Sequence, residues 1–230
     1  MKKLLFGAFI VTLIAAAPAR AQSEKPVHFN IGGGMTMPVS SEKDHFGIGG
    51  GFNAGMIINV NPMFGLQAEY SFNSLSGKDK QIPLFTTPTP QGSNTTTISS
   101  HHDMHYIDFN GILKVPGDSK VKPYALGGAG FYYRTVSLTT PDVGFTTICD
   151  PWWYVCYPAA VAIDKVIGER HSWDPGMDIG GGVTVALGES AQFYAETRWH
   201  YVWGPEFTGA DGVAKKANGQ YFPVTFGFRF

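Results

Sequence analysis

The sequence predicts an all-β protein, an eight-stranded antiparallel up-and-down transmembrane β-barrel with short periplasmic turns and long extracellular loops. Three observations predict it. Apolar and polar residues alternate with a period of two, short and long connections alternate, and the N-terminus resembles an export signal. The composition agrees, because 15% of the 230 residues are charged, 14% are aromatic and 29 are glycine. A typical soluble domain has about 25% charged residues.

The first 21 residues are predicted to be a secretory signal peptide. Met1-Lys2-Lys3 is basic, Leu4 to Ala17 is apolar apart from Thr12, and Ala19-Arg20-Ala21 fits a cleavage site. The apolar run is shorter than the roughly 20 residues that a membrane-spanning helix needs. We therefore expect cleavage after Ala21, export from the cytoplasm and a single barrel domain over residues 22–230.

Eight segments alternate strongly enough to be strands that cross a membrane. In residues 193–203, the apolar and aromatic side chains fall on one face and Glu196, Arg198 and His200 fall on the other. Most segments are close to the 9–11 residues of a tilted membrane strand. The segments are about 27–38, 46–59, 64–74, 103–115, 121–138, 173–187, 191–203 and 219–230.

The connections between these segments are short at one end of the barrel and long at the other. Residues 59–62, 116–119 and 188–190 form tight turns, whereas 75–102, 139–172 and 204–218 are long and 39–45 is of moderate length. An up-and-down barrel produces this alternation when all the long loops lie on one side.

A soluble barrel around an apolar cavity would have the same period, so the distribution of side chains must decide which face meets lipid. Aromatic residues gather near strand ends on one face, as in a membrane girdle, and charged residues with glycines occupy the other, as in a narrow lumen. The expected girdle consists of Trp199, Tyr201, Trp203, Phe228 and Phe230, and the expected lumen charge network of Glu69, Asp108, Lys114, Asp178, Glu196, Arg198 and Arg229.

The lumen of an eight-stranded barrel is just wide enough for side chains to fill. Because buried charges need partners, we expect these residues to form a plug of ion pairs and hydrogen bonds. Arg198 is predicted to be central, with Glu196 and Glu69 as candidate partners, and Arg134 is a further candidate cation. An ion pathway is the alternative, since charges inside a membrane often mark one.

Cys149 and Cys156 are the two cysteines of the mature chain, and export makes a loop disulfide between them our expectation. Their spacing is not that of a redox motif. Trp152, Trp153, Tyr154 and Tyr157 surround the pair, which suggests a compact aromatic cap that either contacts a partner or packs on the barrel rim. Residues 86–100 are polar and contain proline, as in a loop.

Two histidine-containing groups are candidates for chemistry. His101, His102 and His105 lie in one short segment, but residues four apart on a strand are about 13 Å apart, too far for one metal ion. His171, Ser172 and Asp174, or His200 with a loop serine, would suit a hydrolase, but no motif supports this. We expect no catalytic residue, no metal site and no cofactor. A net charge of -1 argues against a nucleic-acid partner.

The residues Tyr124 to Phe131, Tyr194 to Tyr201 and Phe222 to Phe230 carry a family resemblance. The pattern resembles the small outer-membrane β-barrel family of Gram-negative bacteria, the OmpX-like proteins and the OmpA transmembrane domain, over essentially the whole mature chain. The resemblance implies a location in the outer membrane of a Gram-negative type of cell, in contact with outer-membrane lipid and lipopolysaccharide. It also implies that the assembly machinery recognises the C-terminal strand ending in Phe230. We therefore expect no periplasmic domain of the kind that full-length OmpA relatives have after their barrel.

That family contains adhesins, structural barrels and enzymes. The primary expectation is a non-enzymatic outer-membrane protein with a largely plugged polar lumen. Its role would be structural, or it would bind an extracellular ligand through its loops. The alternatives are an enzyme that modifies envelope lipid, similar to a lipid A deacylase, and a narrow channel for small solutes.

Overall fold

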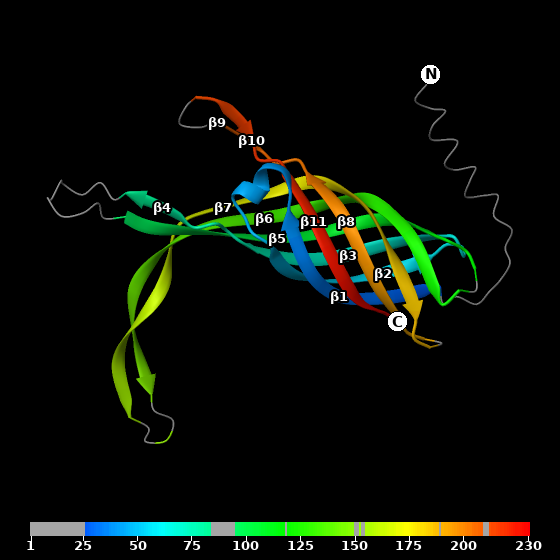
Figure 1. The fold of residues 1–230 in the computed structure, drawn as a ribbon, viewed down its shortest axis with the longest axis horizontal. Helices are drawn as coiled ribbons and strands as arrows, with labels where there is room; N and C mark the ends of the chain where they lie inside the picture. Colours follow the sequence, from blue (N-terminus) through cyan, green and yellow to red (C-terminus); the bar gives the residue numbers. More distant parts are fainter. Residues whose placement is uncertain are drawn as a thin grey trace.

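The computed structural model describes residues 26–83, 95–117, 119–149, 152, 155–188, 190–208 and 212–230. The predicted signal peptide lies outside the described residues. Eight long strands form a closed antiparallel ring in chain order (Figure 1), in which β3 pairs with β5 and the last strand, β11, pairs with the first. They are β1 (Val27–Pro38), β2 (Gly49–Asn59), β3 (Phe64–Ser76), β5 (Thr95–Lys114), β6 (Val121–Cys149), β7 (Cys156–Ala186), β8 (Gln192–Val202) and β11 (Gly219–Arg229). The predicted fold class is confirmed.

The short elements all lie at the end of the ring that carries the long connections, which we call the loop end (Figure 1). They are η1 (Ser40–Asp44), β4 (Lys80–Pro83) beside the start of β5, and the hairpin of β9 (Glu206–Thr208) with β10 (Ala214–Lys216). The tight turns lie at the opposite end, the turn end, where Phe29 and Phe230 exchange backbone hydrogen bonds of 3.1 and 2.9 Å. Within the described ranges, no helix is long and apolar enough to span a membrane.

Four strands differ from the expected segments. β6 and β7 run far into a region predicted as a loop, because residues 139–149 and 156–166 pair with each other as one long hairpin. These residues are rich in threonine, valine, isoleucine and aromatics, which favour strands even without clean alternation. β5 also begins early, at Thr95, where its first residues pair with β4. The expected strand from residue 46 begins only at Gly49, and Phe46 instead packs on a buried cluster at the loop end.

Alternation separates the two faces of the wall as predicted. In β8, Tyr194, Glu196, Arg198, His200 and Val202 are buried in the lumen, whereas the residues between them are only partly buried. Large apolar side chains are exposed all around the outside, and they include Phe29, Phe52, Phe109, Phe131, Trp173, Ile179 and Phe226. A water-soluble barrel would not present such a surface, so hydrocarbon is its natural surrounding.

Glycines on the inner face of the wall leave room for long side chains of neighbouring strands. A Cβ at Gly130 would collide with the carboxylate of Asp108, and one at Gly32 would collide with the hydroxyl of Tyr194. These positions let long polar side chains cross the lumen, which is how so narrow a barrel is filled.

Candidate functional site

The candidate site is the buried polar layer halfway along the lumen, and Arg198 lies at its centre. The guanidinium donates from Nη2 to Glu69 Oε1 at 2.7 Å and from Nε to Glu196 Oε1. Its Nη1 lies 3.8 Å from Asp108 Oδ2 and 3.9 Å from Asp178 Oδ2. One arginine thus faces four carboxylates from four strands, all of them buried.

The other two cations of the expected network lie nearer the turn end. Arg229 Nη2 donates to Tyr124 Oη at 2.8 Å and lies 3.4 Å from Glu196 Oε2. Lys114 donates to Asn59 Oδ1 at 2.6 Å. It lies six residues along β5 from Asp108, which corresponds to about 20 Å. The structure therefore places Arg229 at the edge of the Arg198 layer and Lys114 apart from it.

Apolar side chains lie on both sides of the charged layer. Toward the loop end, the buried cluster consists of Leu75, Met104, Tyr106, Tyr132, Val202 and Tyr221, with Phe46 packed against it. Toward the turn end, it consists of Ile57, Ile112, Tyr124 and Leu126. Because protein interiors pack densely, these layers leave the charged layer little access to water from either end.

The mouth at the loop end contains a second ion cluster. Arg134, a candidate cation of the expected plug, lies here and not in the Arg198 layer, and its partners Glu42 and Asp174 were not expected. Arg134 Nη2 lies 2.6 Å from Asp174 Oδ2, and its Nη1 lies 3.9 Å from Glu42 Oε1. Glu42 also accepts hydrogen bonds from the Gln220 N–H and the Tyr221 hydroxyl, both at 3.2 Å. These contacts tie η1 across the mouth. No sequence signal points to them, since Glu42 lies in a connecting segment and joins β11 only in three dimensions.

Glu42 makes the mouth sensitive to pH. Burial raises the pKa of its carboxyl from 4.5 to about 7, although Arg134, the Gln220 N–H and the Tyr221 hydroxyl each lower it. A folded-state pKa above the unfolded value means that the folded protein binds the proton more tightly, so stability is lost as the pH rises from about 4.5 to about 7.

We expect Glu42→Gln to remove this loss. The variant should be more stable than the wild type at pH 8 by about 1–2 kcal/mol and similar to it at pH 4 to 5. Thermal unfolding in detergent micelles across this pH range measures the difference. Glu169→Gln is the matched control, since Glu169 is exposed on β7. If Glu169→Gln changed the pH dependence of stability as much as Glu42→Gln, Glu42 would not be the source of this pH dependence.

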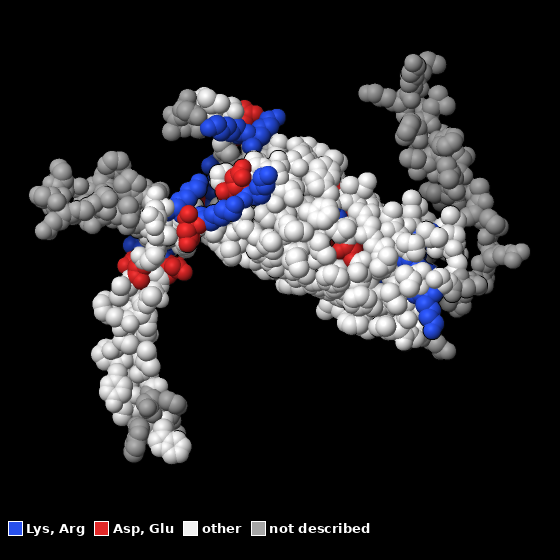
Figure 2. All heavy atoms as spheres, in the orientation of Figure 1, with Lys and Arg blue, Asp and Glu red and all other residues white. Residues whose placement is uncertain are grey.

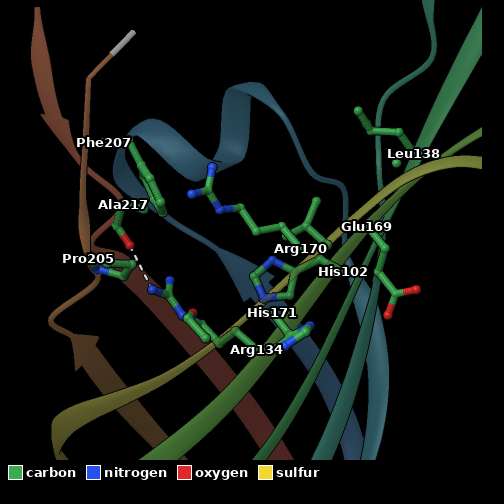
Figure 3. Close-up of a pocket in the computed structure, with 12 residues that line it drawn as sticks. His102, Arg134, Leu138, Glu169, Arg170, His171, Pro205, Phe207 and Ala217 are labelled. Carbon is green, nitrogen blue, oxygen red and sulfur yellow. Dashed lines mark hydrogen bonds between the residues drawn. The ribbon is translucent and has the colours of Figure 1, made fainter.

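A cavity of about 410 Å³ opens beside this cluster, between β6, β7 and the segment that follows β8. Arg170 stacks 3.6 Å from the ring centre of Phe207, and Arg134 donates to the Ala217 carbonyl at 2.8 Å (Figure 3). Apolar side chains such as Val136, Leu138 and Pro205 complete the wall. The cavity can accept an apolar group with an anionic end.

The histidine groups considered from the sequence do not assemble. His101 and His105 lie on the outer face of β5, 2.8 Å from the Ser74 and Tyr70 hydroxyls respectively, whereas His102 is buried on the inner face. On β7, Ser172 donates to Asp174 at 2.7 Å, but His171 faces the other way, toward Tyr133. No serine–histidine pair forms there.

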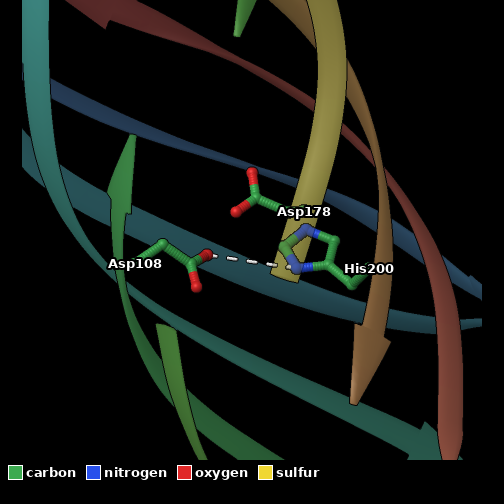
Figure 4. Close-up of side chains that lie close together, drawn as sticks. All are labelled: Asp108, Asp178 and His200. Carbon is green, nitrogen blue, oxygen red and sulfur yellow. Dashed lines mark ion pairs between the residues drawn. The ribbon is translucent and has the colours of Figure 1, made fainter. Parts of the chain in front are cut away.

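His200 does take part in a group, but not the one considered from the sequence. It lies inside the lumen, where Asp108, Asp178 and His200 each offer a ligand atom within 4.8 Å of the others (Figure 4). Period-two alternation places all three on the inner face, but their meeting depends on register and barrel closure, which the sequence does not display.

The expected girdle residues lie on the outer face. Tyr201 and Trp203 are near the loop end and Phe228 and Phe230 at the turn end, whereas Trp199 is paired with Ile179 and lies nearer the middle of the wall than a girdle residue should. Trp199, Tyr201 and Trp203 form a ladder with ring centres 5.9 and 5.3 Å apart, and Phe228 and Phe230 stack at the turn end. From Phe193 to Trp203 the strand is about 33 Å long, and a tilt of roughly 40° reduces this to about 25 Å. That is the height of a membrane-facing apolar band.

The β6–β7 hairpin continues beyond the ring from Thr139 and Val166 to the disulfide between Cys149 and Cys156. A register shift between Leu138 and Thr139 marks where it bends away from the barrel axis (Figure 1). Figure 2 shows charged residues at its root, and the described arm residues beyond them, 143–149 and 155–163, carry no Lys, Arg, Asp or Glu. Phe145 is 84% exposed and Trp152 80%. The predicted residues Trp153 and Tyr154 lie outside the described residues.

Loss of the disulfide should affect only the arm. In the double variant Cys149→Ser with Cys156→Ser, we expect several-fold faster proteolysis within residues 140–165, since the cross-link no longer limits opening of the tip. The melting temperature of the barrel should stay unchanged, because the arm lies outside the ring. Limited proteolysis of proteoliposomes and thermal unfolding measure the two effects, and a lower barrel melting temperature would contradict the separation.

Comparisons with known proteins agree with this architecture. The family model "Outer membrane protein beta-barrel domain" matches residues 7–230. Neisserial surface protein A is similar in structure, with a TM-score of 0.50 and 15% identity over 90% of this chain and 98% of that one. A major outer membrane protein from Thermus thermophilus has a TM-score of 0.50 and 10% identity over 89% and 98% of the two chains. Comparison with curated proteins finds no match. The chain therefore belongs to the outer membrane protein beta-barrel domain family and is an eight-stranded barrel of the outer membrane.

Proposed function

We propose that this protein is a non-enzymatic surface protein whose β6–β7 arm binds an extracellular partner while the barrel serves as its anchor. The arm is the observation that carries the proposal. It extends eleven residues of β6, Thr139–Cys149, beyond the ring, is closed by a disulfide and carries exposed apolar side chains, among them Val143, Phe145, Ile148, Trp152, Tyr157 and Ile163. Exposed apolar surface of this kind, held rigid by a cross-link, is typical of a contact site.

The plugged lumen supports an anchoring role over a channel. The Arg198 layer is filled by ion pairs and hydrogen bonds, and apolar clusters lie on either side of it. The opposite orientation of His171 and Ser172 supports a non-enzymatic role over a hydrolase.

The proposal includes two envelope partners. Lipid and lipopolysaccharide would cover the wall between the girdles, with their charged groups near the basic and acidic residues of the mouth. The assembly machinery would recognise β11 and the residue that follows it. Phe228 and Phe230 are exposed on the outside, and the edge of β11 closes on β1.

The arm can be tested by deletion. Residues 143–162 are replaced by a Gly-Asn turn between Asp142 and Ile163, which are paired in the ladder. Outer-membrane vesicles carrying either form are applied to surfaces coated with extracellular-matrix proteins, serum proteins or lipopolysaccharide. We expect at least one surface to capture intact vesicles at least tenfold better than vesicles with the shortened arm. Equal capture on every surface would contradict the proposal.

Two further measurements test the alternatives directly. Reproducible openings in planar bilayers would support the narrow channel. A change in the mass spectrum of lipid A between cells with and without the protein would support a lipid-modifying enzyme. We expect neither result.

A further inference from the structure

The four carboxylates around Arg198 are not equivalent. Glu69 accepts hydrogen bonds from Asn30, Asn53 and Gln67 at 2.6–2.9 Å in addition to Arg198. Glu196 accepts from Arg198, from Tyr124 at 2.6 Å and from Arg229 at 3.4 Å. Both glutamates are therefore fully provided with donors, and their two charges are matched by the two arginines.

Asp108 and Asp178 lack comparable partners. Tyr132 donates to Asp108 Oδ1 at 2.9 Å, but no other residue in the described part of the chain donates a hydrogen bond to Asp108 Oδ2 or to either oxygen of Asp178. Both residues are at least 96% buried. Arg198 Nη1 lies 3.8 and 3.9 Å from their Oδ2 atoms, beyond hydrogen-bond distance. In their ionised form the two aspartates would add two negative charges to the lumen, and burial of uncompensated charge is strongly unfavourable.

Local structure brings the two aspartates together. They extend from β5 and β7, on either side of β6, and the residues paired with them on β6 are Gly130 and Gly128. Because these inward-facing positions have no side chain, the carboxylates can approach each other across β6. Asp178 is also paired directly with His200 on β8.

A hydrogen-bond chain prepares His200 as a ligand. When Asp108 is ionised, Tyr132 donates its one hydroxyl proton to it, and His200 Nδ1, at 2.8 Å from Tyr132 Oη, is then the donor of the second contact. His200 Nε2 then carries a lone pair, and no described residue donates to it although the side chain is 99% buried. Figure 4 shows the nitrogen-bearing edge of the ring turned toward the two carboxylates.

We propose that Asp108, Asp178 and His200 bind one divalent first-row transition-metal ion inside the barrel. A doubly positive ion would balance the two aspartate charges that Arg198 and Arg229 leave unmatched. Two carboxylates with one imidazole suit zinc or a similar ion better than calcium or magnesium, which prefer oxygen ligands alone.

The distances allow such a site. One ring nitrogen of His200 and one oxygen of each carboxylate lie within 4.8 Å of one another, and His200 Nδ1 lies 4.0 Å from Asp108 Oδ2. Ligands about 2.0–2.2 Å from a zinc ion are roughly 3–4 Å apart. Metal binding would therefore require the carboxylates and the imidazole ring to turn toward the ion. The metal would join β5, β7 and β8 across the lumen, and Tyr132 of β6 would orient His200, so its role would be structural. This inference is independent of what the arm binds and departs from the expectation of no metal site.

Metal content tests the inference. The full chain, without a histidine tag, is folded into detergent micelles from a chelator-treated state in the presence of Zn²⁺ or Co²⁺, then desalted and measured by mass spectrometry. We expect the wild type to retain one metal ion per chain. We expect Asp178→Asn and His200→Gln, which keep the size of the side chain, to retain at least tenfold less metal. Bound Co²⁺ should give visible absorption bands that change in His200→Gln.

His101→Gln is the matched control, because His101 lies on the outer face 3.1 Å from Asp103 and is the alternative place for a surface-bound ion. We expect it to retain the metal. The metal should raise the melting temperature of the wild type and of His101→Gln by several degrees but not that of His200→Gln. A wild-type protein that retains no metal would overturn the proposal, as would loss in His101→Gln with retention in His200→Gln.

Discussion

Replacing Arg198 with alanine is expected to be the most damaging single change in this protein. It leaves Glu69, Glu196, Asp108 and Asp178 around a lumen that has lost its central cation. Removing one partner of a buried ion pair typically costs about 3–5 kcal/mol, because the remaining charge stays buried without compensation. Folded barrels resist denaturation when they are heated in detergent, and gel electrophoresis shows this. We expect Arg198→Ala to lose this resistance or to unfold at a much lower temperature than the wild type.

Three further variants separate loss of charge from general disruption. Arg170→Ala removes an exposed arginine at the mouth and should leave the barrel unchanged. Arg198→Lys keeps the charge but not the planar fork and should be intermediate. Adding Glu69→Gln to Arg198→Ala should restore part of the stability, since it removes one unmatched charge. Heat-resistant folding of Arg198→Ala equal to that of the wild type would show that Arg198 is not central.

The sequence was sufficient to predict the ring of eight strands and the side of the wall on which each charge lies. Both follow from alternation, which is a local property of each strand. Glu196 and Arg198 are two residues apart and therefore share a face in any strand. The contact of Arg198 with Glu69 could be predicted because the polar faces of both strands point into one narrow lumen.

Features that depend on register and stagger could not be predicted in the same way. Asp108 meets Asp178 because Gly128 and Gly130 lie between them on β6, and this pairing is visible only in the closed sheet. Glu42 meets Arg134 across the mouth for a similar reason. The arm was missed because its ladder lies outside the barrel, where no single apolar face imposes a period-two pattern.

A charged residue on the lipid-facing wall is expected to have the second largest effect. Ile179 is 63% exposed on the outer face of β7 and is paired with Trp199 of β8. Along β7, Ile179 lies between Pro175, whose carbonyl accepts a hydrogen bond from the Trp203 N–H near the loop end, and Val185, which is paired with Phe193 near the turn end. This position is near the middle of the apolar band, where an arginine on a membrane barrel costs about 2–4 kcal/mol. Ile179→Arg should lower the free energy of unfolding from lipid vesicles by that amount.

The matched control for this prediction is Ile163→Arg, the same substitution on the arm of the same strand. Ile163 is 44% exposed, but it lies beyond the ring and outside the lipid. Its replacement should change the free energy of unfolding by less than about 0.5 kcal/mol, as is usual for surface substitutions. Urea titrations of both variants in vesicles measure the difference. Since the two isoleucines differ mainly in their surroundings, equal effects would mean that hydrocarbon does not cover the outer face. The assignment of polar side chains to the lumen would then have to be reversed.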